Sequence, residues 1–339
     1  MQTTAVRDMR LALAILAALA AVSLFAQTPL IEQGRAAISR GDTAAAIDIL
    51  ENAVAQSPKS AEAHFYPANA YGSKAQKSGM FGAARYASRA KGEFLKAVAL
   101  NPQYVEARFG LVQFYAAAPG IMGGSYEKAF EQAKEIKTID PIAGHRAYAF
   151  IYSQQKKPDL AKQEYLDAIR EQPNSLMAHG HFGQYLVNVE KNYTAAFAEF
   201  ETALKLDPSY MPAFYHLGRT AAQANTNVAP GEEALKKYLA YTPKENEPTL
   251  ANAHYFLGAI YENEGKKAEA KQIYQAALKL NPSLKQASEA LKLCPLLILV
   301  SMPVSLSRPM LRKPLGISWP TNDCFVSTSP AISFTAQAL

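Results

Sequence analysis

The feature that most constrains the fold of this chain is a pattern of small and large apolar residues that recurs about every 34 residues. In the clearest copy, Ala251–Leu284, the pattern residues stand at positions 4, 7, 8, 11, 20, 24, 27 and 32. They are His254, Leu257, Gly258, Tyr261, Ala270, Tyr274, Ala277 and Pro282. Within each half of the copy they follow the three-to-four spacing of one helix face. Each copy is therefore predicted to form two helices, each with an apolar stripe that must pack on a neighbour.

The pattern continues along most of the chain. Its other regular copies are Gln27–Ser60, Ile142–Ser175 and Leu176–Tyr210, the last with one extra residue between its helices. Three more copies carry insertions: about ten residues after Tyr71, the loop Ala118–Ser125 and the detour Asn225–Gly231. One helix pair cannot bury its apolar face alone, so about seven copies are expected to stack around one continuous core.

These spaced residues resemble the tetratricopeptide repeat, with His254 where that family prefers tryptophan. The segment Gly123–Ala129 is also similar to a loop found in exported bacterial members of the family. The resemblance implies an all-α fold over residues 27–293, a right-handed solenoid of about seven helix-turn-helix repeats. Asparagine or aspartate before proline, as at Asn281, is expected to end each second helix, because a residue before proline is pushed out of the α region.

Both ends of the chain depart from the pattern. Residues 1–26 contain two arginines, Arg7 and Arg10, followed by an apolar run, Leu11–Phe25. This run is shorter than the roughly 20 residues of a membrane-spanning helix. We expect a signal peptide cleaved after Ala26 and a periplasmic or secreted bacterial protein, with an uncleaved membrane anchor as the alternative. Residues 294–339 form an irregular tail that is either a disordered appendage or frame-shifted or read-through sequence. Both cysteines lie in this tail, so the repeats are expected to be stable without a disulfide.

The histidines fit the repeat better than they fit a metal site. Position 4 is occupied by His64, His145, His179 and His254, and position 6 by His181 and His216. The family uses a bulky aromatic residue at position 4, so these side chains are expected to pack within their repeats. We therefore predict no metal site and no cofactor. A half-buried imidazole that titrates near pH 6 also predicts a modest loss of stability in mild acid.

Family members bind partners in a concave groove lined by the first helix of each repeat, mainly at positions 2, 5, 9, 12 and 13. Carried over to this sequence, positions 5 and 9 give a predicted groove of Phe65, Asn69, Phe109, Gln113, Gln184, Tyr215, Arg219 and Tyr255. Aromatic anchors and amide groups suit an extended or helical peptide. Arg146 and Arg219 are the only basic candidates there, so the carboxylate clamp of chaperone-binding relatives is not expected.

Two insertions offer further candidate surfaces. The stretch Ser73–Gly92 contains no acidic residue and carries a predicted basic patch of Lys74, Lys77, Arg85, Arg89 and Lys91. This patch is either a site for an acidic partner or a lipid head group, or the solvated face of an extended second helix. The loop Gly120–Ser125 is either a flexible connection in which Ser125 caps the next helix, or the rim of a ligand groove.

The function indicated is that of a non-enzymatic scaffold in the cell envelope that binds a protein or peptide in its concave groove. No catalytic triad, carboxylate pair or Gly-x-Ser-x-Gly elbow is present in the sequence. Part of the net charge of +6 lies in residues 1–26 and 294–339, so basic and acidic residues are nearly equal in number in the repeat region. A nucleic-acid partner is therefore not expected. Two alternatives remain: a periplasmic small-molecule-binding accessory of a transporter, with the Gly120–Ser125 loop as its rim, or a membrane-peripheral assembly factor that uses the basic patch.

Overall fold

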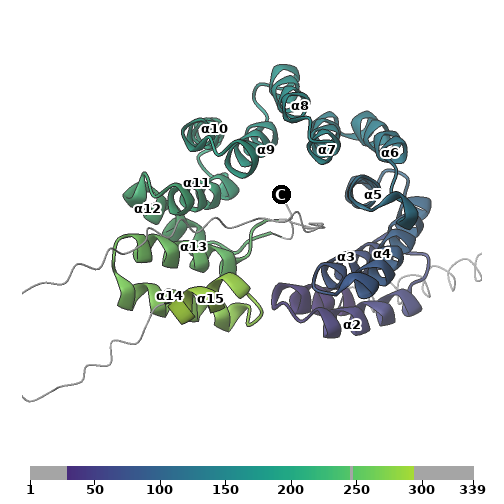
Figure 1. Ribbon diagram of the computed structural model, residues 1–339, viewed down its shortest axis with the longest axis horizontal. Helices are drawn as coiled ribbons and strands as arrows, with labels where there is room; N and C mark the ends of the chain where they lie inside the picture. The colour runs from purple at the N-terminus through teal and green to yellow at the C-terminus, as the bar shows by residue number, and fades with distance from the viewer. Residues whose placement is uncertain (1–28, 245–246, 294–339) are drawn as a thin grey trace, which may run out of the picture.

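The computed structural model describes residues 29–244 and 247–293, and within these ranges every regular element is a helix (Figure 1). The expected signal peptide, residues 1–26, and the expected irregular tail, residues 294–339, lie outside the described residues. No helix of the described ranges is both long and apolar enough to cross a membrane.

The helices of the described chain form seven consecutive pairs followed by a last helix, α15 (Lys285–Leu293). The first members of the pairs are a helix over residues 29–39, α3 (Ala61–Gln76), α5 (Val105–Ala117), α7 (Pro141–Gln154), α9 (Leu176–Tyr185), α11 (Met211–Ala224) and α13 (Leu250–Asn263). The second members are α2 (Thr43–Gln56), α4 (Met80–Leu100), α6 (Tyr126–Ile139), α8 (Pro158–Glu171), α10 (Tyr193–Leu206), α12 (Val228–Leu239) and α14 (Lys267–Leu280).

The pairs follow one another around a ring (Figure 1). From α3 to α14, the first helix of each pair lies on the inner side of the ring and the second on the outer side. Each inner helix packs on its own partner and on the pair before it: α7, for example, contacts α5 and α6 as well as α8. This arrangement confirms the predicted all-α fold, a right-handed solenoid of helix-turn-helix repeats.

Glycine at position 8 lets the two helices of a pair approach each other closely. A methyl group on Gly183 of α9 would lie 2.5 Å from the ring of Phe200 on α10. A methyl group on Gly258 of α13 would lie 2.6 Å from the ring of Tyr274 on α14. These distances are shorter than any carbon–carbon contact, so each aromatic ring fills the space that the missing side chain leaves.

The ends of the second helices follow the prolines, as predicted. The residues before them are extended, with φ between −135° and −142°; they are Asn101, Asp140, Asp207 and Asn281. Asp140 also begins the next helix, because its carboxylate accepts a hydrogen bond from the N–H of Ala143 at 3.0 Å. One residue therefore ends α6 and caps α7, so no further connecting residue stands between the two helices.

The insertions adopt helical forms. The residues added after Tyr71 lengthen both helices of their pair, and α4 reaches 21 residues, which confirms the extended second helix. The loop after α5 contains a short 3-10 helix, η1 (Gly120–Met122), and Ser125 Oγ accepts a hydrogen bond from Lys128 N–H at 3.3 Å, which confirms Ser125 as the cap of α6. The extra residue after α9 is taken up by a π-helical turn, η2 (Leu186–Glu190), a form suited to a single inserted residue.

Three of the position-4 histidines pack inside their repeats, as predicted, but they also contact glutamates that were not predicted. His179 is 7% exposed, its Nδ1 lies 2.6 Å from Glu199 Oε2 of α10, and its Nε2 lies 2.9 Å from the carbonyl oxygen of Pro173. The matching contacts elsewhere are those of His64 with Glu93 and Pro58, and of His145 with Glu164. Each of these histidines joins an inner helix to its outer partner. Within the described ranges, no group of three potential metal-ligating side chains occurs.

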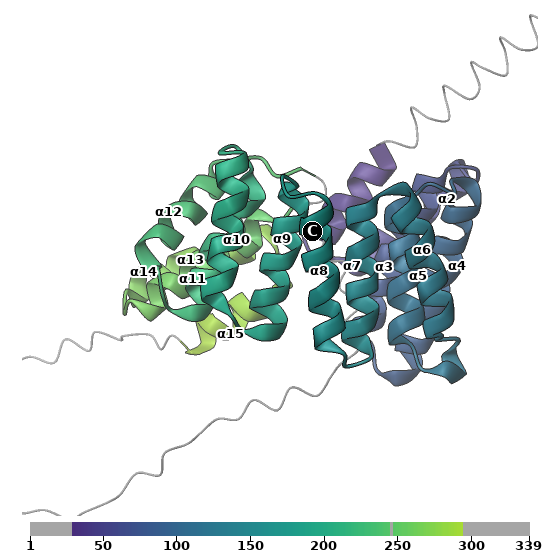
Figure 2. The same ribbon diagram turned by 90° about the horizontal axis from the view of Figure 1, so that it is seen from above.

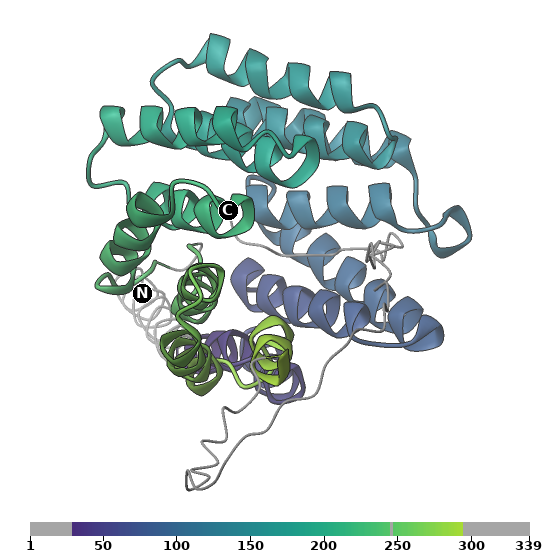
Figure 3. The same cartoon turned by 60° about the vertical axis from the view of Figure 1, so that its left-hand side comes forward.

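The two ends of the ring meet, so that the first and last pairs touch (Figures 1 and 3). Gly41, in the turn before α2, has a φ of +77°, and a methyl group on it would lie 1.7 Å from Ser283 Oγ and 2.6 Å from Asn281 Oδ1. Lys77 Nζ donates a hydrogen bond to the Gly41 carbonyl oxygen at 3.3 Å, and its pKa is lowered by burial and by the nearby charge of Lys285. The turn after α14 therefore packs directly on the first pair.

Alanine at Gly41 is expected to weaken this ring closure. Gly265 is a matched control, because it stands at the same repeat position with the same φ of +77° and has no neighbouring atom within 4 Å of an added methyl group. Both substitutions introduce left-handed backbone strain of about 1 kcal/mol. Gly41→Ala is expected to lower the free energy of unfolding in urea by about 1–3 kcal/mol more than Gly265→Ala, because it also overpacks the joint. Equal losses for the two variants would contradict the ring closure.

Candidate partner-binding site

The predicted groove residues fall on the inner helices, but the structure separates them into groups. At the start of the array, Asn69 and Gln113 line one small pocket between α3, α4 and α5. Phe65 lies beside that pocket and packs on Phe94 and Tyr104, with ring centroids 6.1 and 4.9 Å away. Phe65 is therefore partly covered by its own neighbours, while the two amides lie together in this pocket beside α4.

A second group lies where α5 meets α7. The guanidinium carbon of Arg146 is 4.1 Å from the centre of the Phe109 ring, a cation–π contact. The same ring packs edge-on against Phe150, at 5.9 Å. Arg146 is half-buried, and burial lowers its pKa. The predicted anchor Phe109 thus lies next to a cation that is removed from bulk water.

A third group lies where α11 meets α13. Arg219 donates a hydrogen bond to Asn188 Oδ1 of η2, and its guanidinium carbon lies 5.8 Å from the centre of the Phe256 ring. Tyr215 is only 5% exposed and packs on Phe256 at 5.9 Å, so it supports the wall of the groove and offers little surface of its own. Tyr255 is half-buried and also contacts Phe256, at 5.0 Å between ring centres.

The inner face of α9 connects the second and third groups. His181, Gln184 and Asn188 follow one another at spacings of three and four, which places them on one helical face. His181 interacts electrostatically with Arg146, and Asn188 accepts the hydrogen bond from Arg219. We call this row the central strip, and it consists of Phe109, Arg146, His181, Gln184, Asn188, Arg219 and Phe256.

Within the described part of the chain, the two guanidiniums of the central strip are balanced only at longer range, through the electrostatic interaction of Arg146 with Glu106. Among the described residues, no carboxylate lies within ion-pair distance of Arg146 or Arg219. Burial and the neighbouring Arg146 hold the pKa of His181 well below its ordinary value. Burial and Arg219 lower the pKa of His216 to about 3. Both imidazoles are therefore neutral at physiological pH, and the two guanidiniums provide the charge of the strip.

Two polar atoms of the central strip have no hydrogen-bond partner among the described residues. They are Nδ1 of His181 and Nε of Arg219, both fully shielded from solvent. An unpaired buried donor or acceptor costs roughly 1–3 kcal/mol. Because both atoms are shielded from solvent, this cost is borne by the folded chain itself. The partly exposed guanidiniums of Arg146 and Arg219 are the groups suited to hold a carboxylate, since arginine pairs with carboxylates through parallel hydrogen bonds.

Several residues of the strip were not predicted from the sequence. Asn188 of the strip, at position 13, and Phe150, which packs against Phe109 of the strip and stands at position 9, obey the same register as the predicted set, so a complete use of the family positions would have found them. Arg146 was noted as a basic candidate but not included. Phe256 and His181 occupy position 6, outside the groove positions, and no signal in the sequence marks them.

Most residues of the predicted basic patch contact other side chains or the backbone of this chain. Arg89 pairs with Glu51 at 2.7 Å and lies over the Tyr71 ring at 4.2 Å. The other contacts are those of Arg85 with Tyr86, of Lys91 with Phe114 and of Lys77 with the Gly41 turn. At least four of the five charges thus have partners within the molecule. The Gly120–Ser125 loop contributes its helix cap and stands away from the central strip.

Comparison with known proteins identifies the class. The tetratricopeptide repeat family matches residues 31–71 and again residues 251–284. Together with the helix pairs described above, these matches show that the chain contains tetratricopeptide repeats.

Individual relatives are distant. The uncharacterized protein ycf37 of Pyropia yezoensis is 32% identical over 79 residues, which make up 23% of this chain and 44% of that protein. The match therefore spans less than half of that relative's length. Among solved structures, a tetratricopeptide repeat protein from Parabacteroides merdae is 17% identical, with 79% of this chain and 98% of that chain covered and a TM-score of 0.45. Yeast Tom70 is 14% identical, with 75% and 58% covered and a TM-score of 0.48.

The buried neutral histidines predict a loss of stability in acid. Unfolding frees His216 to titrate near pH 6.5, whereas in the folded state its pKa is about 3, so only the unfolded state gains a proton as the pH falls below 6.5. The folded state is therefore destabilised, by about 2 kcal/mol at pH 5 for one such histidine. His181 and His254 act in the same direction. In urea titrations between pH 7 and 5, His216→Phe should show a smaller loss than the unsubstituted protein, and an unchanged loss would contradict this explanation.

Proposed function

We propose that this protein is a non-enzymatic scaffold that holds an extended segment of a partner protein along its concave surface, with an acidic side chain of the segment bound at the central strip. Tetratricopeptide repeat arrays generally serve as protein-interaction scaffolds. The single observation that carries the acidic specificity is the pair Arg146 and Arg219, half-buried on aromatic rings with no carboxylate partner among the described residues.

The physical reason for an acidic partner is desolvation. Two guanidiniums already removed from water bind a carboxylate more strongly than exposed arginines do, because the folded chain has already paid the cost of burying them. The Phe109 and Phe256 rings at the two ends of the strip offer apolar surface for the flanking residues of the segment. The amides of Gln184 and Asn188 lie between them and match the hydrogen-bonding groups of an extended backbone.

Paired synthetic peptides test this proposal. The probes are fluorescein-labelled peptides rich in Leu and Tyr that differ only in carrying Glu or Gln at their centres. We expect the Glu peptide to bind more tightly, and Arg146→Gln or Arg219→Gln to weaken its binding by about tenfold to a hundredfold. The matched control is Arg170→Gln on the outer helix α8, where Arg170 is exposed and paired with Asp167.

The peptide-binding results either support or rule out a carboxylate site. Loss of the Glu preference in both inner-helix variants, with Arg170→Gln unchanged, supports the proposal. Equal affinity for the Glu and Gln peptides, or equal weakening by Arg170→Gln, would rule out a carboxylate site at the central strip. Circular dichroism of each variant establishes that the array remains folded, so that lost binding is assigned to the site.

We also propose that the protein acts in the cell envelope. The support is the sequence of residues 1–26, in which a short apolar run follows two arginines and ends in Ala26. Mass spectrometry of the protein recovered from an expressing bacterium should find a mature chain that begins at Gln27. A chain that retains residues 1–26 and stays in the cytoplasmic fraction would contradict export.

A further inference from the structure

Two insertions expose large apolar side chains at their tips. Met80 and Phe81, at the start of α4, are 79% and 87% exposed, and Ile121 of η1 is 99% exposed. Neither insertion is needed for the stacking of the pairs, because the regular copies lack both of them. Exposed apolar side chains that gather at one edge of a molecule, rather than being scattered singly, mark an interaction surface.

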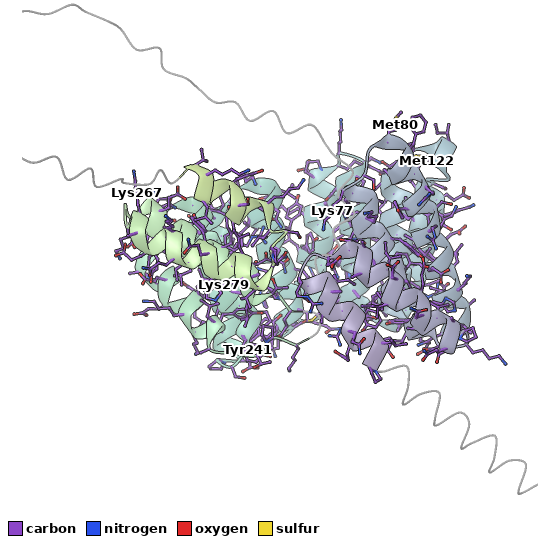
Figure 4. The ribbon with its side chains drawn as sticks, turned by 90° about the horizontal axis from the view of Figure 1, so that it is seen from below. Lys77, Met80, Met122, Tyr241, Lys267 and Lys279 are labelled. Carbon is purple, nitrogen blue, oxygen red and sulfur yellow. The ribbon has the colours of Figure 1, made fainter. Side chains whose placement is uncertain are left out.

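Both tips lie on the same edge of the ring. Each pair has an internal turn between its two helices, and α3–α4 and α5–α6 carry the insertions in that turn. The internal turns lie along one rim of the ring, and the turns between pairs lie along the opposite rim (Figure 2). Figure 4 places Met80 and Met122 close together at one edge, with Tyr241, from a turn between pairs, at the other.

The rim of internal turns is also rich in basic residues. Exposed examples along it are Arg40, Lys77, Lys156, Lys157, Lys191, Lys266 and Lys267. Its acidic residues include Asp42, Glu127, Asp159, Glu190 and Glu264, of which Glu190 is paired with Lys162 at 3.1 Å and Glu264 with Lys266 at 2.9 Å. Lys156 and Lys191 end their helices in the left-handed conformation, with φ of 58° and 55°. The opposite rim carries charges of both signs, with Asp140, Asp207 and Glu247 beside Lys59, Lys244 and Lys285.

We infer that this rim docks on the surface of an anionic lipid bilayer, with Met80, Phe81 and Ile121 entering the interface between head groups and acyl chains. Projecting single side chains on separate turns suit a deformable lipid surface, because they form no groove that would receive a protein side chain. Rows of lysine beside them complement the negative potential of anionic head groups. An edge-on orientation leaves the inner helices open, so this inference does not depend on the proposed binding of a partner at the central strip.

Vesicle binding by the full-length chain tests the inference. The probes are phosphatidylcholine vesicles with and without about one quarter phosphatidylglycerol, at low salt and at about 0.15 M salt. We expect binding to the anionic vesicles, little binding to the neutral ones, and weakening by salt. Met80→Ser/Phe81→Ser and Ile121→Ser should each lower the partition coefficient on the anionic vesicles by about tenfold. Lys156→Gln/Lys157→Gln/Lys191→Gln should lower it and reduce its dependence on salt.

The control replaces two partly exposed leucines on the opposite rim. Leu206 and Leu280, at the ends of α10 and α14, are 39% and 43% exposed. Leu206→Ser/Leu280→Ser should leave vesicle binding unchanged, and both ends of the chain are present in every variant. The inference is overturned if the chain does not bind anionic vesicles, or if the tip variants bind as well as the unsubstituted chain. Equal loss of binding by the Leu206→Ser/Leu280→Ser control would also overturn it. So would tip variants that bind vesicles normally but no longer self-associate in the ultracentrifuge, because the tips would then form a contact between copies of this chain.

Discussion

The structure depends on the close approach of each inner helix to its outer partner. Glycine at position 8 makes room for a large residue at position 24, so that Gly183 lies under Phe200 and Gly258 under Tyr274. Close-packed pairs present their remaining apolar surface to the next pair, and the array grows one pair at a time. Because each pair contacts mainly its neighbours, the angle between pairs accumulates along the chain. Here it accumulates until the last turn reaches the first pair.

The binding surface follows from the same packing. Position 6 on an inner helix is buried in most repeats. In two repeats it is occupied by a histidine, His181 or His216, and burial lowers the pKa of each imidazole so that it stays neutral. Their presence gives the inner wall a polar character beside Arg146 and Arg219. The π-helical turn η2 brings Asn188 to Arg219. A single extra residue in one repeat thus contributes directly to the candidate site.

The fold was predictable because its determinants are local and repeated. Eight spaced positions in Ala251–Leu284 were sufficient to predict the helix pairs, their stacking and their ends before proline. The glutamates that pair with His64, His145 and His179 also recur at equivalent positions and could have been found by reading the second helices as closely as the first. Contacts between distant repeats, such as that of Gly41 with Ser283, could not be predicted, because they depend on the curvature of the whole array. The grouping of the groove residues depends on the same curvature and could not be predicted either. The burial of Tyr215 depends on the rings that pack around it, those of Tyr238 and Phe256.

The exposed tips are a different case. The sequence marked Ser73–Gly92 as basic, but the structure ties Arg89 and Lys77 to the first pair and places the lysines of other turns on the same rim. A linear stretch of charge was therefore a poor guide to the charged surface. The rim became visible only when turns from separate repeats were placed along one edge.

The central claim is that the inner face of α9 contacts an acidic segment of a partner. Site-specific photo-crosslinking in the cell tests this most directly, with benzoylphenylalanine in place of Gln184 on α9 or of Gln163, which is exposed on the outer helix α8. The account predicts that position 184 gives a defined adduct whose crosslinked peptide contains aspartate or glutamate near the attachment site, and that position 163 does not. The same adduct from both positions, or a crosslinked peptide without acidic residues, would contradict it.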